Sequence, residues 1–331
     1  MGSLAAAPVA NASRTKFLSA LKHQGALVAL IIASIFGFAR YAAFLTPENI
    51  VNILRQNSMV GLVAIGMTFV ILTGGIDLSV GAILAVAGIV LCMAAPYGTA
   101  VAIVAAVGVA SLIGLLNGLL IAKARIQPFI TTLAMMIAAR GLALAVTKEN
   151  SIPLPDNASG ISNIGQGDIG PLPIPVVIIV VAFVVAWIVL RYTRFGRYVY
   201  AVGDSVDAAK LLGLNVDRIL IATYVLSGAF AGLAGVVLAA RLGAAQPVAG
   251  TGWELDAIAA VVVGGTVLTG GRGGVGLTMI GVLLLGVILN LLNLEGTISP
   301  WWQWVIRGVF LLAVVVVQGR LQRKTAAGEA A

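Results

Sequence analysis

The sequence predicts an all-α protein that crosses a membrane many times. Of its 331 residues, 60% are hydrophobic and only 10% are charged, and the mean hydropathy is +1.08. A soluble domain carries roughly 25% charged residues. A membrane-spanning helix needs ~20 apolar residues, so the chain has room for about ten spans joined by short connections. The 40 glycines fit this class, because small residues let membrane helices approach closely.

The first five spans are bounded by charged and turn-forming residues. The helix over 25–44 is interpreted as a retained span, because Phe44-Leu45-Thr46-Pro47 is no small-residue cleavage site. The next two flank the polar stretch Gly74–Ser79, although 57–95 can also be interpreted as one long interrupted segment. The fourth and fifth meet at Lys123 and Arg125. Their predicted ranges are 25–44, 57–73, 79–95, 99–122 and 128–147.

The last five spans follow the same logic. The sixth and seventh are separated by a polar segment that begins at Arg191, and the eighth and ninth by glycine-rich residues around Arg272. The eighth is short for a straight crossing, so it either spans fully or re-enters. The tenth starts at Trp301. The predicted ranges are 174–190, 219–240, 255–268, 275–293 and 301–318.

Positive charge predicts the orientation. With the N-terminus inside, most of the 20 lysines and arginines fall on the cytoplasmic side, as the positive-inside rule requires. This bias also explains the net charge of +8 without invoking nucleic acid. We therefore expect cytoplasmic tails over 1–24 and 319–331 and a transmembrane domain over 25–318. The exceptions, outside or within spans, are Arg40, Arg55, Arg140, Lys148, Arg241 and Arg307. The longest exterior loop is 148–173, and the largest cytoplasmic loop is 191–218.

Several chemistries are excluded by the residues that the chain lacks. Its only cysteine is Cys92 in an apolar run, and its only histidine is His23 in the tail, so we expect no disulfide, metal site or Cys/His catalysis. No G-x-x-x-x-G-K-[ST] motif occurs, so the chain does not hydrolyse ATP through a P-loop. Gly271–Gly276 matches G-x-G-x-x-G, but it lies between apolar runs and predicts a tight turn. We expect a transport protein that binds no cofactor itself.

Glycine patterns suggest how the helices are arranged. Leu72-Thr-Gly-Gly75 is echoed by Leu268-Thr-Gly-Gly271. Corresponding glycine-interrupted segments are typical of a transporter built from repeats. The alternative is that the two segments match by coincidence in a glycine-rich chain. The G-x-x-x-G pairs at 114–118 and 228–232 favour helix packing within the chain over dimerisation.

Polar residues within apolar runs are candidates for a translocation path. A charge at the bilayer centre costs ~3 kcal/mol on insertion scales, so we expect Asp77 near an interface. It either caps the following helix through its own or Ser79's oxygen, or lines the path. The other candidates, chosen by polarity, are Asn57, Thr68, Thr73 and Asn117. The alternative is that each of them bonds a neighbouring helix.

The polar segment 193–218 interrupts the apolar sequence for longer than a simple connection requires, which predicts a surface that meets a cytoplasmic partner. Its Asp207-Ala-Ala-Lys-Leu-Leu-Gly213 resembles the E-A-A-xxx-G coupling loop of ABC importer permeases, with Asp for Glu and without the I-x-L-P ending. Thr193-Arg-Phe-Gly-Arg197, residues 66–81 and residues 246–266 resemble the ribose-type sugar permeases of ABC importers. The resemblance runs in order from about residue 40 to 318.

The resemblance implies a type II ABC importer-like permease in the bacterial inner membrane. Its cargo would be a monosaccharide, a ribose-like pentose or a hexose, moved by alternating access. The implied partners are a cytoplasmic ATPase that uses ATP and magnesium, a periplasmic sugar-binding protein, and a second permease copy, identical or related. No nucleic acid is implied.

The resemblance also assigns roles to residues of this chain. The coupling helix would lie within 200–218, and the loops 148–173 and 241–254 would receive the binding protein. The docking candidates are Asp156, Arg241, Gln246 and Glu254. The candidates for coupling to the ATPase are Arg194, Arg197, Gly203, Asp207, Ala208, Ala209, Lys210 and Gly213.

A secondary sugar transporter driven by an ion gradient is the competing class. Such proteins usually carry ionisable relays inside their spans. Arg140 and Arg307 are the main candidates, and the sequence offers neither of them an obvious acidic partner within a span.

Overall fold

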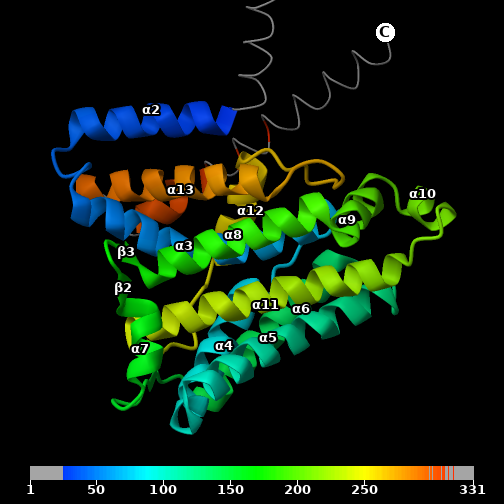
Figure 1. The fold of residues 1–331 in the computed structure, drawn as a ribbon, viewed down its shortest axis with the longest axis horizontal. Helices are drawn as coiled ribbons and strands as arrows, with labels where there is room; N and C mark the ends of the chain where they lie inside the picture. Colours follow the sequence, from blue (N-terminus) through cyan, green and yellow to red (C-terminus); the bar gives the residue numbers. More distant parts are fainter. Residues whose placement is uncertain are drawn as a thin grey trace, which may run out of the picture.

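The computed structural model describes residues 25–297, 299, 301–306, 308, 309, 312 and 316. Long helices form a bundle, with short elements at its two ends (Figure 1). The helices are α2 (Gly25–Arg40), α3 (Pro47–Leu72), α4 (Val80–Ala94), η1 (Ala95–Tyr97), α5 (Thr99–Ala122), α6 (Pro128–Thr147), α7 (Ser159–Gln166), α8 (Ile174–Tyr192), α9 (Arg194–Asp204), α10 (Val206–Leu211), α11 (Val216–Leu242), α12 (Trp253–Val263) and α13 (Val275–Glu295). The strands are β1 (Ile152–Pro153), β2 (Asp168–Ile169), β3 (Leu172–Pro173) and β4 (Ala244–Ala245).

Seven helices of the described residues are long and apolar enough to cross a membrane: α3, α4 with η1, α5, α6, α8, α11 and α13. The helix α2 is apolar but has only 16 residues. Of the two alternatives for the predicted span 255–268, the structure favours re-entry over a full crossing. The helix α12 has 11 residues and measures about 16 Å, against a hydrocarbon core of about 30 Å. It stops before Gly265, whose φ of +107° ends the helix. Most of the predicted tenth span, including Arg307, lies outside the described residues.

Capping explains the main boundary error. The second helix begins at Pro47 rather than at residue 57, because the Thr46 side chain accepts a hydrogen bond from the Asn49 N–H and proline occupies the first turn. The polar residues of those first turns break the apolar run on which the prediction depended. The regions 148–173 and 191–218 are also more ordered than loops, since the first contains α7 and the second contains α9 and α10.

The helix α11 lies at the centre and packs against α5, α3 and α4. The two G-x-x-x-G pairs meet in its contact with α5. A Cβ on Gly114 would lie 2.3 Å from the Tyr224 carbonyl oxygen, and a Cβ on Gly228 would lie 2.4 Å from the Ala110 carbonyl oxygen. The prediction that these motifs pack within the chain is confirmed.

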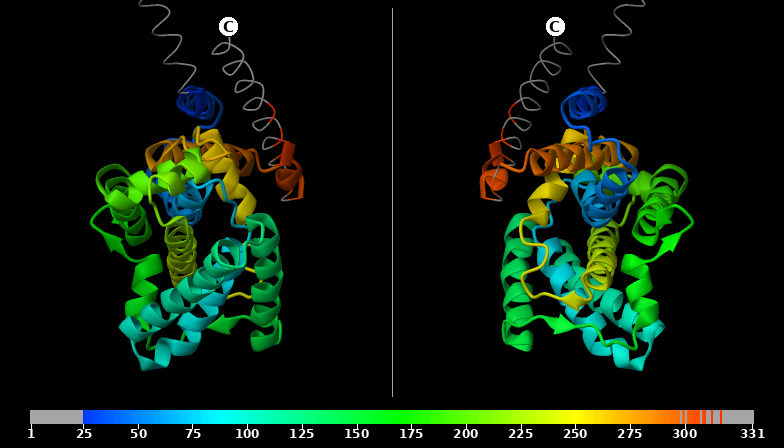
Figure 2. Two further views of the ribbon diagram at one scale, coloured as in Figure 1. Left: turned by 90° about the vertical axis from the view of Figure 1, so that its right-hand side faces the viewer. Right: turned by 90° about the vertical axis from the view of Figure 1, so that its left-hand side faces the viewer.

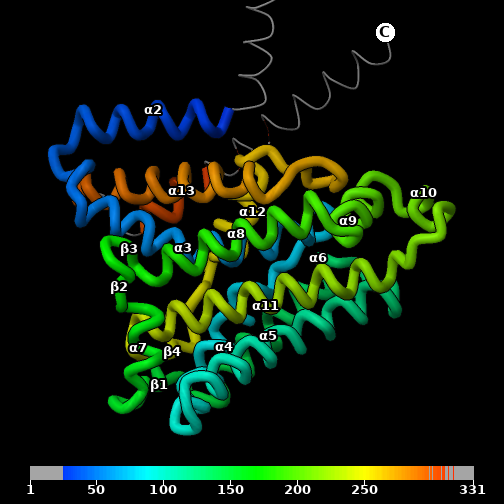
Figure 3. The backbone as a smooth tube through the Cα atoms, in the orientation of Figure 1, coloured from blue at the N-terminus to red at the C-terminus, as the bar shows by residue number. Residues whose placement is uncertain are grey.

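The bundle has two distinct ends, which Figure 3 follows along the backbone. At one end α7 lies beside the β2–β3 hairpin, and β1 pairs antiparallel with β4. At the other end α9 and α10 lie beyond the long helices, with α10 at the edge of the molecule. We call these the α7 end and the α10 end. Views along the bundle show α2 outside it, against α13 (Figure 2).

Candidate functional site

The α10 end exposes a short helix with apolar side chains at its tip. Ser205 starts α10 by accepting a hydrogen bond from the Ala208 N–H at 3.2 Å, and Gly213, with φ +77°, turns the chain back after it. Leu211 is 90% exposed and Leu212 is 75% exposed. Adjacent leucines this open to solvent on a polar segment indicate a surface that another molecule covers.

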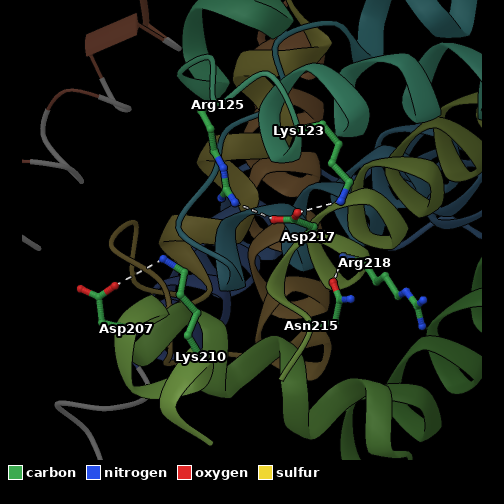
Figure 4. Close-up of polar contacts among 7 residues, drawn as sticks. All are labelled: Lys123, Arg125, Asp207, Lys210, Asn215, Asp217 and Arg218. Carbon is green, nitrogen blue, oxygen red and sulfur yellow. Dashed lines mark hydrogen bonds and ion pairs between the residues drawn. The ribbon is translucent and has the colours of Figure 1, made fainter. Parts of the chain in front are cut away.

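The predicted coupling residues are divided between α9 and the α10 segment. Asp207 and Lys210 form an exposed ion pair at 3.4 Å on α10 (Figure 4). Ala209 is buried and anchors the short helix, whereas Gly203 is half-buried at the end of α9. The remaining coupling candidates are exposed, namely Arg194, Arg197, Ala208 and Gly213.

Gly203 joins α9 to the rest of the bundle. A Cβ at this position would lie 1.8 Å from the Leu72 carbonyl oxygen and 2.5 Å from the Gly271 nitrogen. The Gly271 N–H itself donates to the Leu72 carbonyl at 3.0 Å. The two L-T-G-G segments noticed in the sequence therefore touch one another, and α9 packs against both. The helix α9 thus contacts both the end of α3 and the α12–α13 connection.

An ion-pair bridge ties the start of α11 to the α5–α6 connection. The Asp217 carboxylate lies 2.9 Å from the Lys123 Nζ and 3.2 Å from the Arg125 Nη2 (Figure 4). Asn215 caps α11 by accepting from the Arg218 N–H at 3.1 Å. The sequence reasoning did not select this bridge, because its partners lie far apart in the chain.

Asp77 lies at the centre of a buried polar cluster in the break between α3 and α4. Its Oδ1 accepts from the Ser79 N–H at 3.0 Å and from the Ser79 hydroxyl, and its Oδ2 accepts from the Ser227 hydroxyl of α11 at 2.8 Å. Asn117 of α5 donates to the Ser79 hydroxyl at 2.9 Å. Asp77 is fully buried within the protein. The Ser79 side chain does not cap α4, and it is the Asp77 carboxylate that accepts from the N–H at the start of this helix. Nothing in the sequence pointed to Ser227.

The remaining path candidates form hydrogen bonds within the chain. The Thr68 hydroxyl lies 2.8 Å from the Thr278 hydroxyl of α13. Thr73 donates to the Val70 carbonyl and Asn57 donates to the Ile53 carbonyl, both in α3. Because Thr68, Asp77 and Asn117 are each 0% exposed, none of the three faces an open path in this conformation.

Two loops that are distant in sequence form a joint surface at the α7 end. Strand pairing places Ile152 opposite Ala245, and the Gln166 side chain donates to the Arg241 carbonyl at 3.1 Å. Arg55 of α3 holds this region through an ion pair with Asp168 at 2.8 Å. Of the four docking candidates, Asp156 and Gln246 are exposed, and Arg241 and Glu254 are half-buried.

Arg140 has a structural partner. From α6, its guanidinium donates to the carbonyls of Pro247 at 2.6 Å and Ala249 at 2.8 Å. It thereby holds the 244–252 segment against the bundle. The residue considered as a relay for ion-coupled transport is thus used to position an end loop.

Comparison with known proteins places these features in a family. Residues 49–315 match the family described as "Branched-chain amino acid transport system / permease component". The chain is 42% identical over 306 residues to the ribose import permease protein RbsC of Escherichia coli K12, covering 91% of this chain and 95% of the relative. It is 44% identical over 309 residues to RbsC of Bacillus subtilis, covering 92% and 95%.

A relative named for another sugar is nearly as similar. The galactofuranose transporter permease protein YtfT of Escherichia coli K12 is 40% identical over 273 residues, covering 82% of this chain and 79% of the relative. No solved structure matches the chain. Together with seven helices long and apolar enough to span, these matches show a multi-pass protein of the bacterial inner membrane. The chain belongs to the ribose-type family of ABC importer permeases.

Proposed function

We propose that the chain forms the membrane path of an ATP-driven importer for a monosaccharide, and that α10 is its coupling helix. The observation that carries the proposal is the exposure of Leu211 and Leu212, 90% and 75%, at the tip of α10. An ATPase groove that receives this tip would bury both side chains. Full burial of a leucine contributes about 1.5 to 3 kcal/mol, so each is an effective anchor.

The proposal includes an orientation with both termini in the cytoplasm. Several basic residues lie at the α10 end, in keeping with the positive-inside rule. Lys123 and Arg125 contact Asp217 at the start of α11, Arg191 lies in the last turn of α8 and Arg197 lies in α9. The α7 end then faces the periplasm. There the joint surface of loops 148–173 and 241–254 would receive a sugar-binding protein.

The proposed mechanism is alternating access driven by the partner. When ATP and magnesium close the ATPase, the displacement of α10 reaches α9 and then, through Gly203, the ends of α3 and the α12–α13 connection. The Asp217 bridge carries the same displacement to α5 and α6. A second permease copy, identical or related, completes the pathway, since the polar candidates of this chain are buried among its own helices.

The proposed cargo is a neutral monosaccharide, either a ribose-like pentose or a hexose. Relatives are named for ribose, galactofuranose and fructose. A neutral sugar needs hydroxyl or amide partners rather than charged ones. Movement of the helices would turn such groups, among them Thr68 and Asn117, toward the path.

The test is reconstitution with the proposed partner ATPase. A variant with Leu211→Ser and Leu212→Ser is expected to bind the ATPase at least tenfold more weakly, because about 1.4 kcal/mol corresponds to a factor of ten. Sugar-dependent ATP hydrolysis should fall with it. The matched control is Leu172→Ser at the α7 end, where the side chain is 47% exposed.

The control should keep both association and hydrolysis, and all variants should unfold at the same detergent concentration. Equal ATPase binding by the leucine variant and the control would refute the role of α10. Sugar uptake driven by an ion gradient, without any ATPase, would instead support the secondary transporter.

A further inference from the structure

A cleft of about 400 Å³ lies at the α10 end, between α8, α9 and the start of α13. It combines two kinds of wall. Trp187 and Leu190 of α8 and Val275 and Leu277 of α13 make one part apolar, whereas the side chains of two arginines line another part. These are Arg191, in the last turn of α8, and Arg197, in the first turns of α9.

The two arginines have no acidic partner among the described residues. The ion pairs of the described part involve other basic side chains, and both Arg191 and Arg197 are exposed. The Tyr200 hydroxyl, which also lines the cleft, donates instead to the Gly273 carbonyl at 2.9 Å and ties α9 to the glycine-rich segment before α13. The cleft therefore holds two uncompensated positive charges, and guanidinium groups match a phosphate with paired hydrogen bonds.

The start of α13 adds to this positive charge. Its N-cap residue, Gly274, has no side chain with which to cap the first N–H groups of the helix. These groups belong to Val275 and Gly276, which line the cleft. An anion held by the arginines would also lie near the positive end of this helix.

The apolar side of the cleft continues onto a surface suited to lipid. Trp187 is 45% exposed and Tyr192 is 63% exposed, and their rings pack edge to face with centroids 5.3 Å apart. Exposed Trp and Tyr gather where the membrane meets water. With the orientation proposed above, the cleft opens at the cytoplasmic surface of the bilayer.

We propose that this cleft binds the phosphate headgroup of an anionic phospholipid from the cytoplasmic leaflet. Arg191 and Arg197 hold the phosphate, and the first part of one acyl chain lies against Trp187 and Leu190. Basic pockets between helices on this side of a membrane are suited to such headgroups. A bound lipid would bridge α8 and α9 to α13, and so support the element that carries the coupling helix. The proposal rests on the orientation proposed above, but on neither the sugar nor the ATPase.

The test uses the full-length chain, purified alone and examined by native mass spectrometry. The probes are phosphatidylglycerol, zwitterionic phosphatidylethanolamine and inorganic phosphate, each added in separate titrations. The wild type should keep one bound phosphatidylglycerol at a collisional activation energy that strips phosphatidylethanolamine from it. The variant Arg191→Gln/Arg197→Gln should bind phosphatidylglycerol roughly 30-fold more weakly, given the usual contribution of a basic residue beside an anionic lipid surface.

The matched control is Arg194→Gln/Arg272→Gln, which removes the same charge from exposed positions at the same end but outside the cleft. It should keep the wild-type affinity. If the glutamine variant does not fold, Arg191→Lys/Arg197→Lys keeps the charge but loses the paired geometry of guanidinium. This lysine variant should bind phosphatidylglycerol several-fold more weakly than the wild type.

Three results would overturn the proposal. The first is equal loss of phosphatidylglycerol from the cleft variants and the control, which would indicate non-specific attraction. The second is binding of inorganic phosphate without retention of phosphatidylglycerol, which would make the cleft a site for a free anion. The third is a cleft that binds no lipid and becomes inaccessible to solvent only when the ATPase is added.

Discussion

Replacing Gly203 by alanine should separate α9 from the helices that it is proposed to move. A Cβ there would lie 1.8 Å from the Leu72 carbonyl oxygen and 2.5 Å from the Gly271 nitrogen. Non-bonded heavy atoms are best separated by roughly 3.5 Å, so the junction has to open by more than about 1 Å. Both opposing atoms belong to the backbone, so no side-chain rotation relieves the clash.

The expected magnitude combines two contributions. Overpacking of a well-packed site costs about 1 to 3 kcal/mol, and the loss of the hydrogen bond from Gly271 to Leu72 costs about 1 kcal/mol. We expect Gly203→Ala to lower the free energy of unfolding by about 2 to 4 kcal/mol. The reconstituted importer should also lose sugar-dependent stimulation of ATP hydrolysis, because α9 no longer contacts the ends of α3 and the α12–α13 connection.

The assay is detergent-induced unfolding together with ATP hydrolysis in proteoliposomes. Gly141→Ala is the control, because a Cβ at Gly141 meets nothing within 4 Å and the residue lies in α6, away from the Gly203 junction. If Gly203→Ala matches this control in both stability and stimulation, the junction is not tight and the proposed route of coupling is wrong. If stability falls while stimulation persists, the junction is structural only.

Two further predictions concern the centre of the bundle. Gly228→Ala should destabilise the chain by about 1 to 3 kcal/mol, because the added carbon would lie 2.4 Å from the Ala110 carbonyl oxygen. The control is Gly108→Ala, where nothing lies within 4 Å of the added carbon. It should leave the free energy of unfolding unchanged or raise it slightly. Equal effects in the two unfolding curves would mean that α5 and α11 do not pack closely. Asp77→Ala should cost roughly 3 kcal/mol, since it removes the acceptor of three hydrogen bonds. Asp77→Asn should cost less in the same unfolding assay, because an amide oxygen still accepts; a more damaging Asn variant would contradict this account of the cluster.

Composition and charge were sufficient to predict the class of protein, and local motifs predicted part of its packing. The glycine pairs on α5 and α11 identified a helix contact, because close approach requires small residues at a fixed spacing. Span boundaries were less predictable. The helix α12 ends early because Gly265 adopts a positive φ, and α3 starts early because Thr46 caps it. Neither feature changes the hydropathy on which spans are recognised.

In the candidate site, too, local features could be predicted from the sequence and contacts between distant segments could not. The position of α10 could be predicted, since its residues are contiguous in the sequence. The partners of Asp77 could not, because Ser227 and Asn117 come from two other helices and only the fold brings them to the carboxylate. The Asp217 bridge depends likewise on residues about ninety positions away, as the separation of 94 between Lys123 and Asp217 shows.

The pairing of β1 with β4 has a consequence for protein engineering. Each strand has only two residues, and each is the other's partner in a two-stranded sheet. An exchange of loops 148–173 and 241–254 between permeases, made to test the proposed docking of a binding protein, would fail if it moved one loop alone. The graft has to include the segments around both Ile152 and Ala245, so that the transplanted strands arrive as a matched pair.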